Sequence, residues 1–220
     1  MIKVTAFAWV PPFAEGLVRD LRIRWALEEA GEPYEERLLK QGDQDSPEYR
    51  AIQPFGQVPV YEEGGLTLFE SGAILLHIAE RSNALLPLDP AARARAIQWV
   101  FAALNSIEPQ VWNLALIDIF YADEQWAKQR RPGVAEFVEK RLDALTGRLG
   151  DKEYLDDDRF SAGDLMMTTV LRILRHTDLV TGRPALHAYQ LRCEARPAFQ
   201  KALADQIAPF ARNAPPAVAA

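Results

Sequence analysis

Cysteine is almost absent from this chain of 220 residues, which contains Cys193 alone. A single cysteine excludes an intrachain disulfide and any CxxC motif for redox chemistry or zinc. Histidine is also scarce, because His77, His176 and His187 are far apart and lack the spacing of metal ligands. We therefore expect no metal site, and we expect Cys193 to be a buried, inert thiol within a helical pattern.

An excess of positive charge and a long apolar run are missing as well. The chain has 25 Lys and Arg against 31 Asp and Glu, a net charge of −6, and no basic stripe. This balance argues against a nucleic-acid partner or an anionic membrane surface. No apolar run reaches the roughly 18 residues that a membrane span requires. The start, MIKVTAFAWV, has one basic residue and runs into a strand pattern, unlike a signal peptide, so we expect a cytoplasmic protein.

The N-terminal part of the chain alternates between strand and helix patterns. Strands are predicted at residues 2–8 and 34–39, with a helix over 17–30 between them. After a polar segment, residues 55–79 (FGQVPVYEEGGLTLFESGAILLHIA) read as strand, turn, strand and helix. This order is that of a thioredoxin-like α/β domain, which we place at residues 1–81.

The C-terminal part is helical in period throughout. Residues 82–90 contain two prolines and are predicted to be a linker, and 91–220 are predicted to form an all-helical bundle domain. Pro109 should kink or divide its first helix, and Pro132 should stand at the first position of a later one. The first helix should pack through one apolar face, made of Ile97, Val100, Phe101 and Leu104.

A capping signal stands within the C-terminal part. Ser161 and Asp164 are three residues apart, as in a capping box, with Asp in place of the usual Glu or Gln. Phe160 and Leu165 are placed as the accompanying hydrophobic staple. We interpret these residues as a folding element with no catalytic role.

Two features between residues 55 and 79 indicate chemistry. Pro59 stands inside a strand signal, where it removes a hydrogen-bond donor. If the Val58–Pro59 bond is cis, the Val58 amide and carbonyl face outward and can pair with an extended peptide. Glu70 precedes a predicted helix start, and Ser71 is the expected N-cap of that helix. The exposed amides of the helix start and the Ser71 hydroxyl can donate to a carboxylate, and the Glu70 carboxylate can accept from an ammonium. Each residue alone also has a structural interpretation, as a cap or as a charge that favours the helix dipole.

The segment QPFGQVPVYEEGGLTLFESGAILLHIAER resembles the glutathione-binding segment of the cytosolic glutathione S-transferases, here of bacterial type. The likeness extends more weakly over nearly the whole chain. It implies a thioredoxin-like N-terminal domain, a helical C-terminal domain, glutathione as co-substrate and a homodimer that joins one subunit's N-terminal domain to the other's helices. By resemblance, Val58 before a cis Pro59 pairs with the cysteinyl backbone of glutathione, and Glu70 and Ser71 hold its γ-glutamyl head.

The chain departs from the family where a catalytic hydroxyl or thiol is expected. Family members commonly place Tyr, Ser or Cys just after the first strand, but residues 8–16 contain none of these. Arg19 could supply positive charge to a thiolate, although it can equally pair with Glu15, and Arg22 is a weaker candidate. Amides at the predicted helix start could instead bind the sulfur, namely those of Gly16, Leu17 and Val18. A third possibility is that the protein binds without stabilising a thiolate.

The rest of the expected site is less specific. Cation and amide candidates for the glycine end of glutathione are Lys40, Gln53 and Gln57, of which Gln57 occupies the family's usual place before the Val-Pro pair. Each could also be a solvated surface residue. A pocket for a hydrophobic second substrate is expected from Trp9, Phe13, Asn105, Glu108, Trp112 and Phe120, although aromatic residues at helical spacing also serve as core.

The leading interpretation is a glutathione transferase-like enzyme that attacks a hydrophobic electrophile with the glutathione thiol. A variant within this class is disulfide exchange or peroxide reduction by bound glutathione. The alternative is a non-catalytic protein that keeps the fold as a binding module or scaffold. The missing hydroxyl favours the alternative, whereas the intact Val58-Pro59 and Glu70-Ser71 pairs favour the enzyme.

Overall fold

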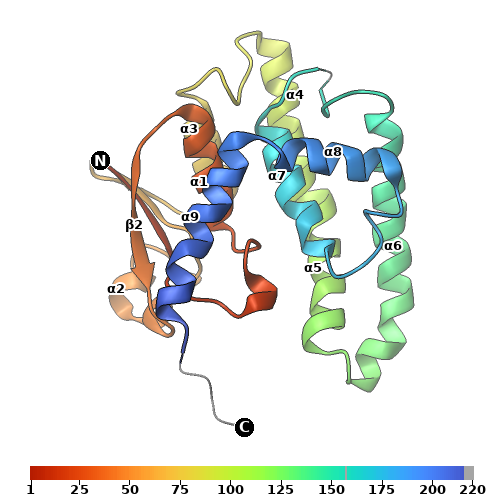
Figure 1. Cartoon of the computed structure of the whole chain (residues 1–220), viewed down its shortest axis with the longest axis horizontal. Coiled ribbons are helices and arrows are strands. Elements are labelled where there is room, and N and C mark those ends of the chain that lie inside the picture. Colours follow the sequence, from red (N-terminus) through yellow and green to blue (C-terminus); the bar gives the residue numbers. More distant parts are fainter. Residues whose placement is uncertain (157, 216–220) are drawn as a thin grey trace. The chain divides into compact units, whose positions relative to one another are not determined.

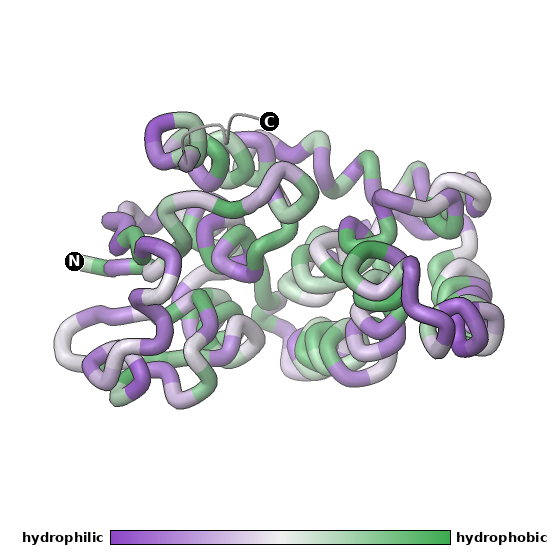
Figure 2. The backbone as a smooth tube through the Cα atoms, turned by 90° about the horizontal axis from the view of Figure 1, so that it is seen from below, coloured by the Kyte–Doolittle hydropathy of each residue, from purple (hydrophilic) through white to green (hydrophobic). Residues whose placement is uncertain are grey.

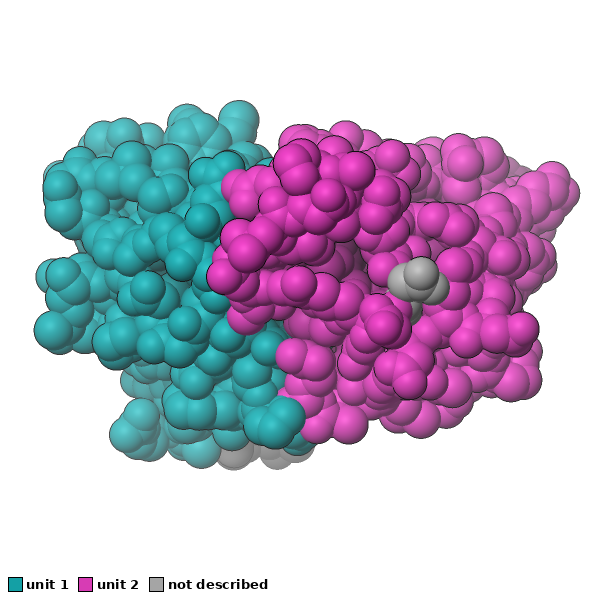
Figure 3. All heavy atoms as spheres, turned by 90° about the horizontal axis from the view of Figure 1, so that it is seen from above, with its two compact units in different colours: residues 1–82, 197–220 teal, residues 83–196 magenta. Residues whose placement is uncertain are grey.

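The computed structural model describes residues 1–156 and 158–215 (Figure 1). Backbone contacts group the chain into two compact units, coloured separately in Figure 3. Unit 1 is Met1–Ser82 together with Pro197–Ala220, and unit 2 is Asn83–Arg196. This grouping differs from the expected helical domain of residues 91–220, because the last helix, α9 (Pro197–Asn213), packs on α1 (Asp20–Ala30) of unit 1.

Unit 1 contains a four-stranded mixed sheet in the order β2-β1-β3-β4. β1 is parallel to β2, and the pairs β1–β3 and β3–β4 are antiparallel. This arrangement confirms the thioredoxin-like α/β fold predicted for the N-terminal part. The strands are β1 (Ile2–Phe7), β2 (Tyr34–Leu39), β3 (Tyr61–Glu63) and β4 (Leu66–Leu68).

The helix α1 packs against two other helices of unit 1. α1 and α3 (Ser71–Ala79) lie side by side, and α9 runs along α1 (Figure 1). Trp25 of α1 and Phe199 of α9 meet edge to face with ring centroids 4.8 Å apart, and both are buried. Shorter elements complete the unit, namely η1 (Pro12–Ala14), η2 (Asp43–Asp45) and α2 (Pro47–Arg50).

Two boundaries in unit 1 differ from the sequence pattern. The first helix begins at Asp20 rather than Leu17, because residues 12–18 form a 3-10 turn and bends. β3 begins at Tyr61 rather than Val58, since Pro59 has no N–H to donate to the ladder.

The regular elements of unit 2 are all helices in the residues that the structure describes, and turns and irregular segments join them. Its helices are α4 (Pro90–Phe101), α5 (Glu108–Ala115), α6 (Gln125–Leu149), α7 (Ala162–Leu171) and α8 (Pro184–Glu194), with π-helical turns η3 (Ala102–Ile107) and η4 (Leu116–Phe120) and the 3-10 turn η5 (Arg172–Leu174). Hydrophobic and hydrophilic residues alternate along these helices (Figure 2). Within residues 1–156 and 158–215, no helix is both long and apolar enough to cross a membrane.

Two helix predictions in unit 2 need correction. The buried face of α4 and η3 is Ala96, Val100, Ala103 and Ile107, whereas the expected Phe101 is 51 % exposed. Pro132 lies inside α6 and not at its start, because the helix already begins at Gln125. Pro109 does divide the helix as predicted: α4 gives way to the π-helical η3 directly before it.

The capping box before α7 is confirmed. Ser161 and Asp164 exchange side-chain and backbone hydrogen bonds, and the Leu155 N–H and the Tyr189 hydroxyl also donate to the Asp164 carboxylate, at 2.9 and 3.0 Å. Cys193 is fully buried, and burial raises the pKa of its thiol to about 12. This cysteine is therefore the inert core residue that the sequence predicts.

Candidate functional site

The end of β1, the entry to β3 and the start of α3 meet at one end of the sheet of unit 1. Tyr61 is opposite Leu68 in the antiparallel β3–β4 pair, so the residues before Tyr61 and those after Leu68 lie at the same end. The Thr5 N–H donates to the Val60 carbonyl at 2.8 Å, which joins the exit of β1 to that end. The strand register therefore puts the segments that contain Val58 and Ser71 at the same end of the sheet, and their joint role in one site stays a prediction.

Val58 leads into β3 through a cis peptide bond to Pro59, which confirms the predicted isomer. The Tyr49 hydroxyl holds this turn by donating to the Gln57 carbonyl at 2.6 Å. Burial raises the pKa of Tyr49 to about 12, so the phenol keeps its proton. Within the described residues, the backbone N–H and carbonyl of the buried Val58 have no hydrogen-bond partner. An unpaired buried backbone group is costly, so this pair points to a ligand or water as partner.

Glu70 and Ser71 stand at the start of α3, one position from where the pattern puts them. The N-cap is Glu70, with φ 70° and ψ 110°, and Ser71 is the first helical residue. Glu70 is exposed, and its side chain makes no capping hydrogen bond. The first N–H groups of a helix have no partner within it, so this end can receive an anion while the Glu70 carboxylate remains accessible to a cation.

Arg22, a weaker candidate in the sequence analysis, contacts Ser71 directly. Its Nη1 donates to the Ser71 Oγ at 3.1 Å, and the two residues are 3 % and 5 % exposed. Asp20 and Arg24 pair with each other in the same helix, so a second arginine between them is the signal that could have found it.

The segment between β1 and α1 supplies the candidates for contact with sulfur. The nearest hydroxyl, that of Thr5, is fully buried inside β1. The Leu17 N–H donates to the Ala14 carbonyl at 3.0 Å, so this amide already has a partner, and its expected contact with sulfur stays a prediction. Val18 packs against the hydrophobic cluster that includes Val58, and no described residue accepts a hydrogen bond from its N–H. Arg19 is the residue before α1 and is partly exposed.

The start of α1 is fixed from α9 by one side chain. The Gln206 Nε2 donates to the Val18 carbonyl at 3.1 Å and to Asp20 Oδ1 at 2.8 Å. Asp20 also binds Arg24 at 2.7 Å in an i,i+4 pair that is fully buried. The loop beside Val58 is thus held by charges and amides in the interior of unit 1.

The candidates for the glycine end differ in their surroundings. Lys40 is exposed, and its backbone is engaged with Asp43: the Lys40 N–H donates to Asp43 Oδ2 at 2.8 Å, and the Lys40 carbonyl accepts from the Asp43 N–H at 3.1 Å. Gln53 is buried and its Oε1 accepts the Phe55 N–H at 2.7 Å, so it holds the turn before Val58. The Gln57 side chain is exposed beside the site, which leaves its role a prediction.

The residues expected to line the second-substrate pocket come from both units, so their meeting stays a prediction. In unit 1, Trp9 is partly exposed and Phe13 is 46 % exposed. In unit 2, Asn105 is exposed and Glu108 is buried, at 6 % exposure. Trp112 and Phe120 are 44 % and 52 % exposed. Three aromatic side chains are therefore surface residues of their own units and not core.

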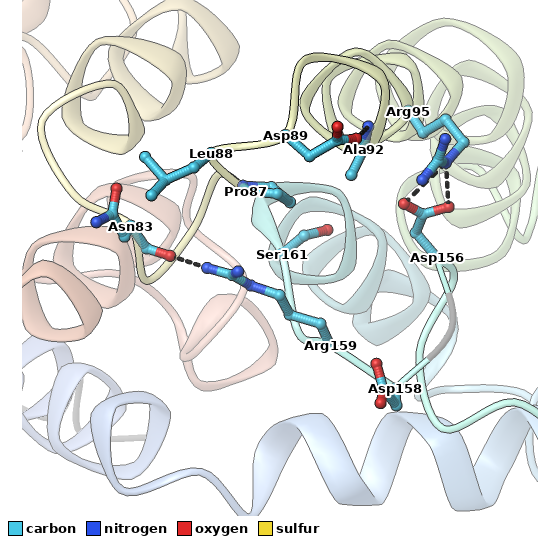
Figure 4. Close-up of a pocket in the computed structure, with 10 residues that line it drawn as sticks. All are labelled: Asn83, Pro87, Leu88, Asp89, Ala92, Arg95, Asp156, Asp158, Arg159 and Ser161. Carbon is cyan, nitrogen blue, oxygen red and sulfur yellow. Dashed lines mark hydrogen bonds and ion pairs between the residues drawn. The ribbon is translucent and has the colours of Figure 1, made fainter.

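A pocket of about 390 Å³ lies within unit 2, between the linker, the start of α4 and the segment before α7 (Figure 4). Its charged groups are engaged: Arg95 binds Asp156 at 2.8 and 3.1 Å, and Arg159 donates to the Asn83 carbonyl. Asp89 accepts the Ala92 N–H at 2.8 Å and caps α4. We interpret this pocket as a folding element. Among the described residues, no group of three or more His, Cys, Asp or Glu could hold a metal ion.

Comparisons with known proteins agree over both parts of the chain. A family model described as "Glutathione S-transferase, N-terminal domain" matches residues 7–80, and one described as "Glutathione S-transferase, C-terminal domain" matches residues 98–197. Glutathione S-transferase 4 of Zea mays is 32 % identical over 225 aligned positions, which cover 96 % of each chain. A glutathione S-transferase of Hyoscyamus muticus is 33 % identical over 175 positions, 75 % of this chain and 82 % of the relative. Among solved structures, a glutathione transferase from Burkholderia graminis, with two glutathione molecules bound per subunit, superposes with a TM-score of 0.81 at 27 % identity, covering 92 % of this chain and 87 % of that one.

Proposed function

Because this chain belongs to the cytosolic glutathione S-transferase family, we propose that it binds glutathione at the end of the sheet where Val58 and Ser71 meet and uses the thiol on a second substrate. The protein is a glutathione S-transferase-like enzyme, and its relatives do not favour a scaffold without activity. The observation that carries the site is the register of β3 and β4, which puts unpaired peptide groups and a helix N-terminus side by side.

Each part of glutathione has a complementary group at this end. The cysteinyl N–H and carbonyl pair with the Val58 backbone, as in the addition of a short strand. The γ-glutamyl carboxylate receives the first amides of α3 and the Ser71 hydroxyl, and its ammonium faces the Glu70 carboxylate. Gln57, with Lys40 and Gln53 as further candidates, lies on the side of the glycine carboxylate.

Activation of the thiol needs donors near the sulfur. A thiol of ordinary pKa near 8.5 requires about 2.7 kcal/mol of preferential stabilisation to lower that pKa by two units. The Val18 N–H, beside the cluster of Val58, and the Arg19 side chain are the proposed donors. Neither needs to accept a proton, so the thiol proton leaves to water.

The second substrate is proposed to be a hydrophobic electrophile, or a disulfide or peroxide, held by Trp9, Phe13 and the surface aromatics of α5 and η4. We propose a homodimer in the cytoplasm. The exposed Phe55, 61 %, and Phe69, 37 %, support self-association, because their rings meet edge to face 6.1 Å apart on the surface of unit 1.

Titration calorimetry with glutathione tests the site. We expect binding by the unchanged protein and a loss of about 1–3 kcal/mol in each of Glu70→Ala and Ser71→Ala, since each removes a partner of a charged group. Glu35→Ala, at an exposed residue of β2, is the control and should bind glutathione as the unchanged protein does. Absence of both heat and thermal stabilisation at millimolar glutathione would refute the proposed function, and unchanged affinity in both variants would refute the residue assignment.

A further inference from the structure

We propose that Arg22 is a positioning residue that makes the site selective for ligands with an α-carboxylate at the γ-glutamyl end. This inference rests on the proposed function and deepens it. Arg22 has no direct contact with the ligand in this account, and acts through Ser71, whose Oγ lies 3.1 Å from its Nη1.

The hydrogen bond fixes what the Ser71 hydroxyl can do. A guanidinium has only donors, so Ser71 Oγ must be the acceptor of the contact with Arg22. The single hydroxyl proton then points away from Arg22 and is available to an acceptor at the N-terminus of α3. A serine without this partner could rotate and accept from a donor instead, so Arg22 makes Ser71 a donor and therefore favours an anion.

Charge adds to this geometry. Arg22 is 3 % exposed and is always protonated, so its positive charge is poorly screened by water. It stands in the first turn of α1, where a cation opposes the helix dipole. A carboxylate beyond Ser71 would be stabilised by this charge. The nearby Arg24 binds Asp20 and Glu36.

Two analogues of glutathione separate this role from a purely structural one. 4-Aminobutanoyl-Cys-Gly lacks the α-carboxylate and keeps the amine, and glutaryl-Cys-Gly keeps the carboxylate and lacks the amine. The quantity measured is the ratio of the Kd of each analogue to the Kd of glutathione, which a general loss of stability does not change. Arg22→Met removes the charge and the donor, Arg22→Lys keeps the charge, and Arg24→Lys is the matched control in the same buried face.

We expect Arg22→Met to weaken glutathione binding about tenfold while hardly changing that of 4-aminobutanoyl-Cys-Gly, so that their ratio falls by about the same factor. Arg22→Lys should show a smaller fall, and Arg24→Lys none. The ratio for glutaryl-Cys-Gly should stay unchanged in all three, since it reports on Glu70. If Arg22→Met does not fold, the Arg22→Lys and Arg24→Lys pair decides the question.

Two results would overturn the role of Arg22. The first is an equal Kd ratio for 4-aminobutanoyl-Cys-Gly in Arg22→Lys and Arg24→Lys. The second is a Kd ratio for glutaryl-Cys-Gly that changes together with the ratio for 4-aminobutanoyl-Cys-Gly. Both results leave the proposed function standing if the unchanged protein binds glutathione. A protein that binds neither glutathione nor its analogues refutes the proposed function itself.

Discussion

Replacing Glu70 separates the stability of the fold from the binding of glutathione. Glu70 has φ 70° and ψ 110°, and it is the single non-glycine residue with positive φ in the part of the chain that the structure describes. Strained backbone conformations cost about 1–3 kcal/mol and occur most often at functional sites. The strain belongs to the backbone, so Glu70→Ala keeps it and Glu70→Gly relieves it.

The expected magnitude follows from two opposing terms. Relief of strain gives about 1–3 kcal/mol, and glycine loses about 0.5–1 kcal/mol more backbone entropy on folding. The two terms together span about 0–2.5 kcal/mol, so Glu70→Gly should be more stable than Glu70→Ala by about 1 kcal/mol, or about 2–4 °C in Tm for a chain of this size. Because the Glu70 side chain is exposed and caps nothing, Glu70→Ala itself should change stability by about 1 kcal/mol or less.

Thermal unfolding of the three proteins without ligand measures these differences, and calorimetry measures binding. Both variants remove the carboxylate, so both should bind glutathione about 5- to 150-fold more weakly, although one is the more stable protein. Gly64→Ala, at φ 56° in the turn before β4, is the reverse control and should destabilise. A Glu70→Gly variant that is no more stable than Glu70→Ala would refute the strain argument.

Three further predictions concern the rest of the chain. Cys193 should not react with a thiol reagent at pH 8 in the native protein, because at a pKa of about 12 only about one thiol in 10⁴ is ionised at that pH. In guanidinium, which unfolds the protein, one thiol per chain should react. Rapid labelling of the native protein would contradict this prediction. Asp164→Ala should lower Tm by about 6–12 °C, since four buried donors lose their acceptor at a cost of about 3 kcal/mol. The exposed Asp151→Ala should change Tm little, and equal shifts in a thermal melt would refute the role of the capping box. Phe55→Ser should raise the dimer dissociation constant at least about tenfold in sedimentation experiments, because it removes exposed apolar surface. The control Leu191→Ser, also at an exposed residue, should leave the constant unchanged. An unchanged constant for Phe55→Ser would exclude Phe55 from the interface.

The central part of the site could be predicted because its signals are local. A proline inside a strand pattern and a Glu-Ser pair at a helix start each have few physical interpretations, so Val58, Pro59, Glu70 and Ser71 could be chosen from neighbours in sequence. Their proximity in space follows from the turn between β3 and β4, which the sequence also contains.

The parts that could not be predicted depend on distant residues. Gln206, 186 positions later, donates to the Asp20 carboxylate at the start of α1, and no local pattern reports that contact. Arg22 looks like one more charge on a helix until Ser71 is placed beside it. Pro132 lies within α6, although the low helix propensity of proline predicts that a helix begins or ends at this position.

A crystal structure of the protein with glutathione tests the central claim most directly. We predict that the cysteinyl N–H and carbonyl lie within hydrogen-bond distance of the Val58 backbone, and that an oxygen of the γ-glutamyl carboxylate lies within that distance of Ser71 Oγ. Glutathione bound elsewhere, or bound with its amine against Ser71, would contradict the account.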